Sequence, residues 1–277
     1  MRIRVFKMIL ILCWICSTVA CGQRSAKTPE QWFDFTWSGL AGRDALTFQG
    51  NAALLRDDKS SLEDSVSYYG ELKNHRELNM VTILPHGNKI GTWQMAGTAN
   101  GNQFAAKLLW EGGSWTLTTN QGDALSQGMT RLNPLDQLEN IRRMNKKKIT
   151  AESGAARGTK VLRIELDPSE AKDMIGSKLI DEMQGLRMGL QNKLAEIEPA
   201  RRSTIEKEVI DLWSSGNEQL VQMLEQAEAR VIYHLTIDRR SGLPQRLTSE
   251  SEMNYRSLAG LQQRELLLTD NRFVKYQ

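Results

Sequence analysis

Apolar and polar residues alternate along much of this chain, and the alternation constrains the fold more than any other feature. In the first such stretch, residues 45 to 56, the apolar side chains share one face: Leu46, Phe48, Ala52 and Leu54. A period of two is typical of a strand with one buried and one solvated face. The sequence therefore predicts a sheet that covers a core on one side.

Ten further stretches are expected to be strands: residues 66–72, 78–84, 91–98, 103–110, 114–119, 149–153, 159–166, 230–238, 245–255 and 262–276. Several of them are joined by short turns, such as Glu111-Gly112-Gly113, where glycine supplies the positive φ of a tight turn. Short connections without crossover helices join antiparallel neighbours. The prediction is an antiparallel sheet of eleven strands.

A capping residue followed by proline opens three predicted helices, at Thr28-Pro29, Asn133-Pro134 and Asp167-Pro168. The first is expected to run to about Gly42. The second is expected to be closed by Lys146-Lys147-Lys148, because positive charge is favourable at the carbonyl end of a helix. A contact between these lysines and phospholipid headgroups is the alternative interpretation.

The third helix begins a long helical hairpin, residues 168–229. Apolar residues recur there at spacings of three and four, first up to a stop at Pro199 and then from a capping box at Ser203 and Glu206 to about Ala229. Ser214-Ser215-Gly216 is a weak point where the second helix is expected to bend or break. The methionines of the hairpin suit ordinary core packing or an adaptable surface that faces lipid.

The N-terminus has the three regions of a signal peptide. Residues 1–7 carry three basic residues and no acid, residues 8–16 are apolar, and residues 17–20 are small or β-branched. The apolar run is shorter than the roughly 20 residues that a membrane span needs. We therefore expect residues 1–20 to be removed and residues 21–27 to form a flexible tether. An uncleaved N-terminal anchor is the alternative.

The tetrapeptide Thr18-Val19-Ala20-Cys21 resembles the bacterial lipobox, although Thr18 stands where Leu, Val or Ile is usual. The resemblance implies cleavage before Cys21 and a diacylglyceryl group, with acyl chains such as palmitate, on the Cys21 sulfur. It places the mature chain on the extracytoplasmic side of the cell membrane, with the membrane itself as a partner through the lipid on Cys21.

Charge and cysteine content argue against nucleic-acid binding and against stabilisation by disulfides. The 36 Lys and Arg and 33 Asp and Glu include the three bases of the signal region, so the mature chain is formally neutral and gives no support to nucleic-acid binding. All three cysteines lie at or before Cys21, so the mature domain contains no disulfide. Its stability must therefore come from a hydrophobic core.

The sequence contains no recognisable catalytic or metal-binding motif. His75, His86 and His234 are far apart and have no cysteine partner in the mature chain, so a zinc site is not expected. We predict no cofactor, no metal and no enzymatic activity. Six tryptophans remain after cleavage: Trp32, Trp37, Trp93, Trp110, Trp115 and Trp213. They suit the core, or an apolar pocket.

The run Ile237-Asp238 followed by Ser241-Gly242-Leu243-Pro244 and an alternating strand resembles the hairpin of lipoproteins of the LolA/LolB and LprG/LppX type, and of related uncharacterised lipoproteins of Gram-positive bacteria. The resemblance implies an α+β fold, an antiparallel open β-barrel curled around helices, over a single domain of residues 28–277. No ligand-binding residue transfers by position, and the long helical hairpin departs from the pattern.

Two functions are compatible with these features. The first is a membrane-anchored extracytoplasmic lipoprotein that binds an apolar ligand or lipid in its concave side. The alternative is a non-enzymatic protein-interaction or sensing module of the cell envelope, in which the helices fill the barrel. Whether the concave side is hollow or plugged distinguishes them.

Overall fold

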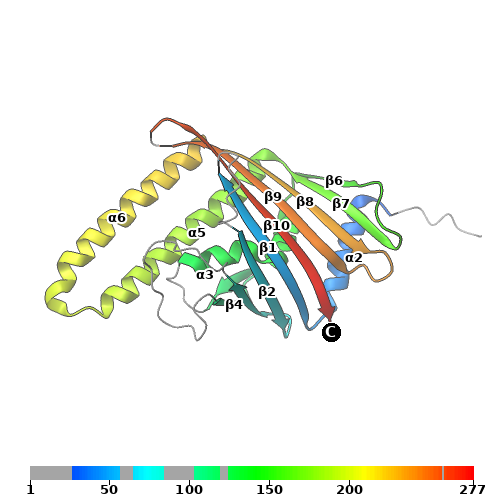
Figure 1. Ribbon diagram of the computed structural model, residues 1–277, viewed down its shortest axis with the longest axis horizontal. Helices are drawn as coiled ribbons and strands as arrows, with labels where there is room; N and C mark the ends of the chain where they lie inside the picture. Colours follow the sequence, from blue (N-terminus) through cyan, green and yellow to red (C-terminus); the bar gives the residue numbers. More distant parts are fainter. Residues whose placement is uncertain (1–26, 57–64, 84–102, 119–123, 258) are drawn as a thin grey trace, which may run out of the picture.

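The computed structural model describes residues 27–56, 65–83, 103–118, 124–257 and 259–277. Within these residues, ten strands form one antiparallel sheet in the order β5-β4-β3-β2-β1-β10-β9-β8-β7-β6 (Figure 1). The strands are β1 (Leu46–Arg56), β2 (Ser65–Lys73), β3 (Glu77–Ile83), β4 (Gln103–Glu111), β5 (Ser114–Leu117), β6 (Lys147–Ala151), β7 (Thr159–Leu166), β8 (Glu228–Asp238), β9 (Pro244–Arg256) and β10 (Gln262–Tyr276).

The two halves of the chain meet in the middle of the sheet. The first strand, β1, pairs with the last, β10, from Leu46 opposite Tyr276 to Arg56 opposite Glu265. β2 to β5 extend the sheet on one side of this pair, and β9 to β6 extend it on the other. The sheet is curled but not closed, since β5 and β6 are its two edges. The predicted antiparallel open sheet is confirmed.

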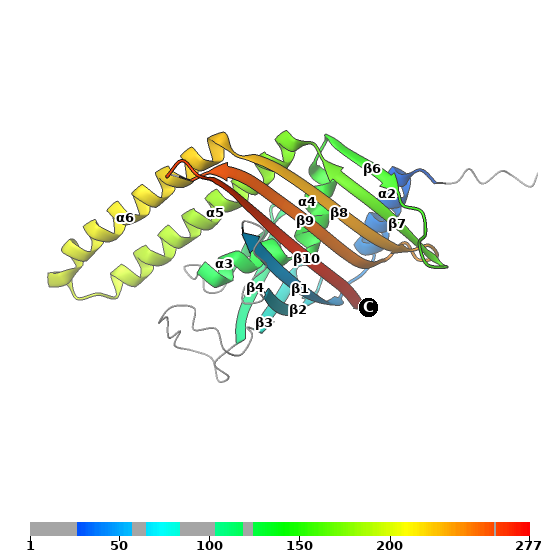
Figure 2. The same cartoon turned by 45° about the horizontal axis from the view of Figure 1, so that its top comes forward.

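Helices cover the concave side of this sheet (Figure 2). They are α2 (Pro29–Ala41), α3 (Ala124–Met129), the 3-10 turn η2 (Thr130–Leu132), α4 (Pro134–Arg143), α5 (Pro168–Ala195) and α6 (Pro199–Gln226). The alternating strand residues that point inward pack against them in one main core. Its largest fully buried side chains include Phe48, Leu78, Met80, Leu138, Ile141, Leu162, Ile164, Leu235, Ile237 and Leu247.

The helical hairpin α5–α6 confirms the predicted insertion and projects beyond the sheet (Figure 1). The first turns of α5 pack under the sheet, where Ala171 and Met174 join the main core. The connection between the two helices lies at the far end of the molecule from the β6–β7 and β8–β9 turns, as both ribbon views show.

The local sequence signals predict three helix starts correctly, and the fourth prediction is wrong. Thr28 forms the predicted capping box with Gln31, and Asn133 and Asp167 cap α4 and α5. The second hairpin helix, however, starts at Pro199 with Glu198 as its cap, so Ser203 lies inside it. Proline fits the first helical turn because its missing N–H would be unpaired there.

Other expectations need correction. Helix α4 ends at Arg143, and Lys147 and Lys148 are the first residues of β6. Lys147 nevertheless donates its ammonium to the Met144 carbonyl at the end of the helix. Helix α6 runs through residues 214–216 without a break, α3 was not predicted, and the strand expected at 91–98 lies outside the described residues.

Candidate functional site

The centre of the concave face is filled by helix side chains. Phe33 of α2, Ile141 of α4 and Met174 of α5 are buried against the inward-facing strand residues. The Tyr233 hydroxyl donates to the Met174 Sδ, at 3.7 Å. In this part of the structure the concave side is therefore plugged.

A chain of buried polar groups crosses β2, β10 and β9 beneath these helices. The Tyr68 hydroxyl donates to Asn271 Oδ1 at 2.8 Å, the Asn271 amide lies 3.5 Å from Thr269 Oγ1, and the hydroxyls of Thr269 and Ser249 are 2.6 Å apart. Burial raises the pKa of the Tyr68 hydroxyl, which therefore stays neutral at physiological pH. These groups satisfy one another, as buried polar groups must.

The described residues cover only part of one end of the concave face, the end at which β1 finishes and β2 begins. Val66 and Leu267 there are half-buried and pack on the edge of the main core, as does Ile175 of α5. Leu54 is half-buried too, and it faces the same side because it pairs with Leu267 and follows the buried Ala52 by two residues. Side chains of β1, β2, β10 and α5 thus leave apolar surface in contact with solvent.

A polar rim lies beyond this apolar surface. Two residues after Leu54, the Arg56 Nε lies 3.0 Å from Glu265 Oε1. The Tyr255 hydroxyl donates to the same carboxylate at 3.3 Å. On this face of β1 and β10, the apolar pair Leu54 and Leu267 is therefore followed, two residues along each strand, by the charged pair Arg56 and Glu265.

The helical hairpin packs on this end through a second, smaller hydrophobic cluster. Leu224 of α6 and Met253 of β9 are buried in it, and Ile175 and Leu179 of α5 pack against it. Gly176 of α5 faces this contact, and a Cβ at its position would lie at an ordinary van der Waals distance, 3.6 Å, from Leu224 Cδ1. Ile175 touches both clusters, so α5 connects the hairpin to the main core.

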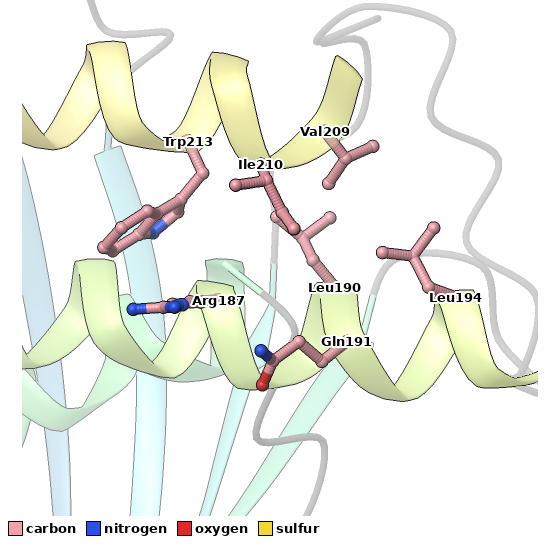
Figure 3. A pocket seen from close by; sticks show the side chains of 7 residues that line it. All are labelled: Arg187, Leu190, Gln191, Leu194, Val209, Ile210 and Trp213. Carbon is pink, nitrogen blue, oxygen red and sulfur yellow. The ribbon is translucent and has the colours of Figure 1, made fainter. Parts of the chain in front are cut away.

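The distal part of the hairpin is closed by its own side chains (Figure 3). Arg187 of α5 stacks on the Trp213 ring of α6 at 4.7 Å, and the Trp213 indole N–H donates to the Met183 carbonyl at 2.9 Å. The cavity that remains between Leu190, Leu194 and Ile210 measures about 10 Å³, which is room for about one water molecule. A ligand of larger size needs the helices to separate.

Two ion pairs hold α5 against η2 and α4. Lys178 pairs with Asp136 of α4, and the Arg131 Nε lies 2.8 Å from Glu182 Oε1. Burial raises the pKa of Glu182 despite its cationic neighbours. These pairs position α5 beneath the sheet.

A polar groove of about 390 Å³ lies at the opposite end of the molecule from the hairpin tip. The β6–β7 turn, the start of α2 and the β8–β9 turn surround it, and its cationic side chains are Lys27, Arg157, Lys160 and Arg239. Sequence reasoning missed this groove because its residues come from three distant segments and form no local motif.

The predicted site residue, Cys21, lies outside the described residues. The histidines do not meet: His75 pairs with Asp44, the His234 Nδ1 lies 2.9 Å from Glu152 Oε1, and His86 is outside the described residues. No group of three potential metal ligands occurs in the part of the chain that the structure describes. Among the described helices, none is both long and apolar enough to cross a membrane.

The tryptophans do not line a common pocket. Trp32, Trp37 and Trp115 pack against the edge of the main core. The ring centroids of Trp110 and Trp115 are 5.3 Å apart, and Trp213 packs within the hairpin. Trp93 lies outside the described residues. Core and interface packing account for four of the five that the structure describes, and Trp32 both packs on the core and lines the polar groove.

No protein-family model and no curated protein matches this chain. It is similar to the solved structure of LprF from Mycobacterium bovis, with 8% identity over 90% of this chain and 92% of that chain and a TM-score of 0.33. It is similar to a LolA superfamily protein from Nitrosomonas europaea, with 8% identity over 91% of this chain and 94% of that chain and a TM-score of 0.24.

A third similar structure describes lipid–protein interactions in lipovitellin, with 8% identity, a TM-score of 0.33 and coverage of 84% of this chain but only 25% of that chain. All three TM-scores are below 0.5. The solved structures similar to this chain thus include LprF and LolA superfamily proteins, which is the resemblance predicted from the sequence.

Proposed function

We propose that this chain is a lipid-anchored protein on the extracytoplasmic side of the cell membrane that binds an apolar ligand, such as a lipid acyl chain, at the partly covered end of its concave face. The anchor is supported by the signal-like N-terminus and Cys21. Ligand binding is supported by one observation: Leu54, Val66, Leu267 and Ile175 leave apolar surface exposed beside the core. The proposed role is binding, without a catalytic step.

The chemistry of this end suits an amphipathic ligand. An acyl chain gains about 25 cal/mol for each Å² of apolar surface that it removes from water, and the half-buried leucines and isoleucine supply such surface. The Arg56–Glu265 pair and the Tyr255 hydroxyl stand at the rim, where a polar headgroup would remain in contact with water. Because the centre of the concave face is filled, the ligand is placed at its open end.

Native mass spectrometry of the protein purified from a heterologous host tests this proposal. We expect a co-purified or exchangeable lipid, and binding of the apolar dye N-phenylnaphthylamine that lipid displaces. The variant Leu54→Ser/Leu267→Ser should lose both signals. Its matched control is Leu55→Ser/Leu266→Ser, because these two residues pair in the next register position on the opposite face. Absence of lipid and dye binding in the unmodified protein would sink the proposal.

The anchor is tested separately. Replacing Cys21 with Ala should leave the domain folded but release it from the membrane, or leave an uncleaved precursor. Labelling with a fatty-acid analogue should disappear in the same variant. Unchanged labelling would overturn the assignment of Cys21.

A second candidate, a protein-interaction module, is favoured by a different observation. The projecting hairpin exposes large apolar side chains: Leu212 is 77% exposed, Met188 51% and Ile210 43%. Crosslinking in intact cells separates the candidates, because a module should trap one stoichiometric protein on the hairpin. A Leu212→Ser/Ile210→Ser variant that keeps lipid binding but loses such a partner would favour the module.

A further inference from the structure

We infer that the polar groove at the β6–β7 end is the membrane-facing surface of this protein and binds the phosphates of anionic phospholipid headgroups. The inference rests on the proposed lipid anchor for the orientation of the molecule, and on the groove itself for the chemistry. It commits to a lipid surface as the occupant, rather than to a soluble anion.

The groove is lined by four cationic side chains that carboxylates do not neutralise in the described part of the chain. Lys27, Arg157, Lys160 and Arg239 line it, and no ion pair joins any of these four side chains to a carboxylate in the described part of the chain. The single acidic lining residue, Glu152, is engaged by His234 at 2.9 Å. Guanidinium and ammonium groups are the side chains that bind phosphate oxygens most strongly.

An aromatic residue stands beside these cations. Trp32 lines the groove, and the Lys27 Nζ lies 4.9 Å from the Trp32 ring and 3.5 Å from the Phe35 ring. Tryptophan is enriched at the headgroup level of membranes, where its ring is apolar and its N–H contacts water. Cations next to tryptophan therefore match the chemistry of an anionic membrane interface.

The length of the tether brings this surface to the membrane. Only five residues separate Cys21 from Lys27, and an extended chain covers at most about 3.5 Å per residue. A lipid on Cys21 therefore keeps Lys27 within about 20 Å of the bilayer surface. In both ribbon views the β6–β7 turn and the start of α2 lie at the same end of the molecule, and the hairpin tip lies at the other.

A consequence is that the anchored molecule contacts the membrane with the end that carries the groove. The α5–α6 hairpin then points away from the membrane. Each basic residue near an anionic surface strengthens binding by about fivefold, and the effect falls off within a Debye length. Four such residues on one end favour the orientation in which this end faces the membrane.

The test uses the full lipidated chain, inserted through its own lipid into vesicles of phosphatidylcholine alone or with 30% phosphatidylglycerol. A photoreactive residue replaces Ala156, which lines the groove beside the cations, or Ser203, which is exposed near the hairpin tip. We expect lipid adducts at position 156, with a higher yield on phosphatidylglycerol vesicles, and none at position 203.

Charge variants show whether the groove causes the adducts. Lys160→Glu/Arg239→Glu should lower the yield on phosphatidylglycerol vesicles to about the yield on phosphatidylcholine vesicles, because two introduced acids cancel the charge of Lys27 and Arg157, with an unchanged circular dichroism spectrum. Lys193→Glu/Arg201→Glu makes the same charge change on the hairpin, where both residues are exposed, and should leave the yield unchanged. Equal yields on the two vesicle types, or an unaffected yield in the groove variant, would overturn the inference.

Two further outcomes separate the groove from the anchor and from other anions. If the chain carries no lipid, the proposed anchor fails, but the groove still predicts salt-sensitive flotation of the unlipidated chain with phosphatidylglycerol vesicles. Lack of such flotation would contradict the groove. Loss of adducts in inorganic phosphate, at matched ionic strength, would identify a soluble phosphate as the ligand and overturn the commitment to a membrane surface.

Discussion

The ring of Phe48 on β1 lies directly over Gly70 on β2, where a Cβ atom would be only 2.2 Å from its Cζ. Two residues further along, the relationship is reversed: the ring of Tyr68 on β2 covers Gly50 on β1, where a Cβ atom would be only 2.3 Å from the Tyr68 Cζ. The residues of each pair are register partners. Each ring fills the space that a side chain on the opposite strand would occupy, and both rings are buried in the main core.

Replacing Gly70 with Ala should therefore destabilise the fold by about 1 to 3 kcal/mol, the usual cost of inserting a methyl group into a packed core. Chemical denaturation measures the change. Gly128→Ala is the control, since nothing lies within 4 Å of a Cβ there. Adding Phe48→Leu to the Gly70→Ala chain should cost less stability than Phe48→Leu costs in the unmodified chain, because leucine leaves room for the alanine methyl group. Equal stability of the Gly70→Ala and unmodified chains would refute the packing.

Removing the Tyr68 hydroxyl should show how much the buried chain of polar groups contributes to the free energy of unfolding. In Tyr68→Phe, Asn271 Oδ1 loses its 2.8 Å donor while staying buried, which costs about 1 to 3 kcal/mol. The neighbouring residue gives a matched control, because Tyr69 is 46% exposed on the opposite face and Tyr69→Phe should change stability by less than about 0.5 kcal/mol. Thermal unfolding of the two variants compares them directly.

Trp213 should control the opening of the hairpin tip. Trp213→Ala removes both the stacking on Arg187 and the hydrogen bond to the Met183 carbonyl. Hydrogen–deuterium exchange of the distal turns of α5 and α6 should then become faster, while β8 and β9 stay protected. Leu212→Ala should leave exchange unchanged, because Leu212 is 77% exposed. Equal protection in both variants would show that other contacts hold the tip.

The Arg246–Asp270 pair predicts a pH dependence. Arg246 donates two hydrogen bonds to the carboxylate, at 2.7 and 2.8 Å, and this lowers the pKa of Asp270 below its ordinary value. A lowered folded-state pKa stabilises the protein above the unfolded pKa, and the contribution is lost as pH falls through the folded value. Arg246→Gln should move the Asp270 titration, followed by carboxyl NMR, back toward about 3.9. An unmoved titration would exclude Arg246 as the cause.

Local signals in the sequence determined most of the secondary structure. Period-two alternation identified ten strands that the structure confirms, and cap-then-proline pairs identified the starts of α2, α4 and α5. These signals succeed because they depend on neighbouring residues. They failed at Ser203, where a capping motif competes with Pro199 four residues earlier, and at α3, which spans only six residues.

The sequence alone also indicated an exported chain with one chemically distinctive residue, Cys21, and a curled antiparallel sheet with a helical hairpin. The packing of Phe33, Ile141 and Met174 into the concave face, and the incomplete cover that the described residues give to one end of it, became visible only in the folded chain. Folding also brings Lys27, Arg157 and Arg239 into one groove. Such sites join residues from distant segments, and their distances depend on how the whole sheet curls, which no local pattern encodes.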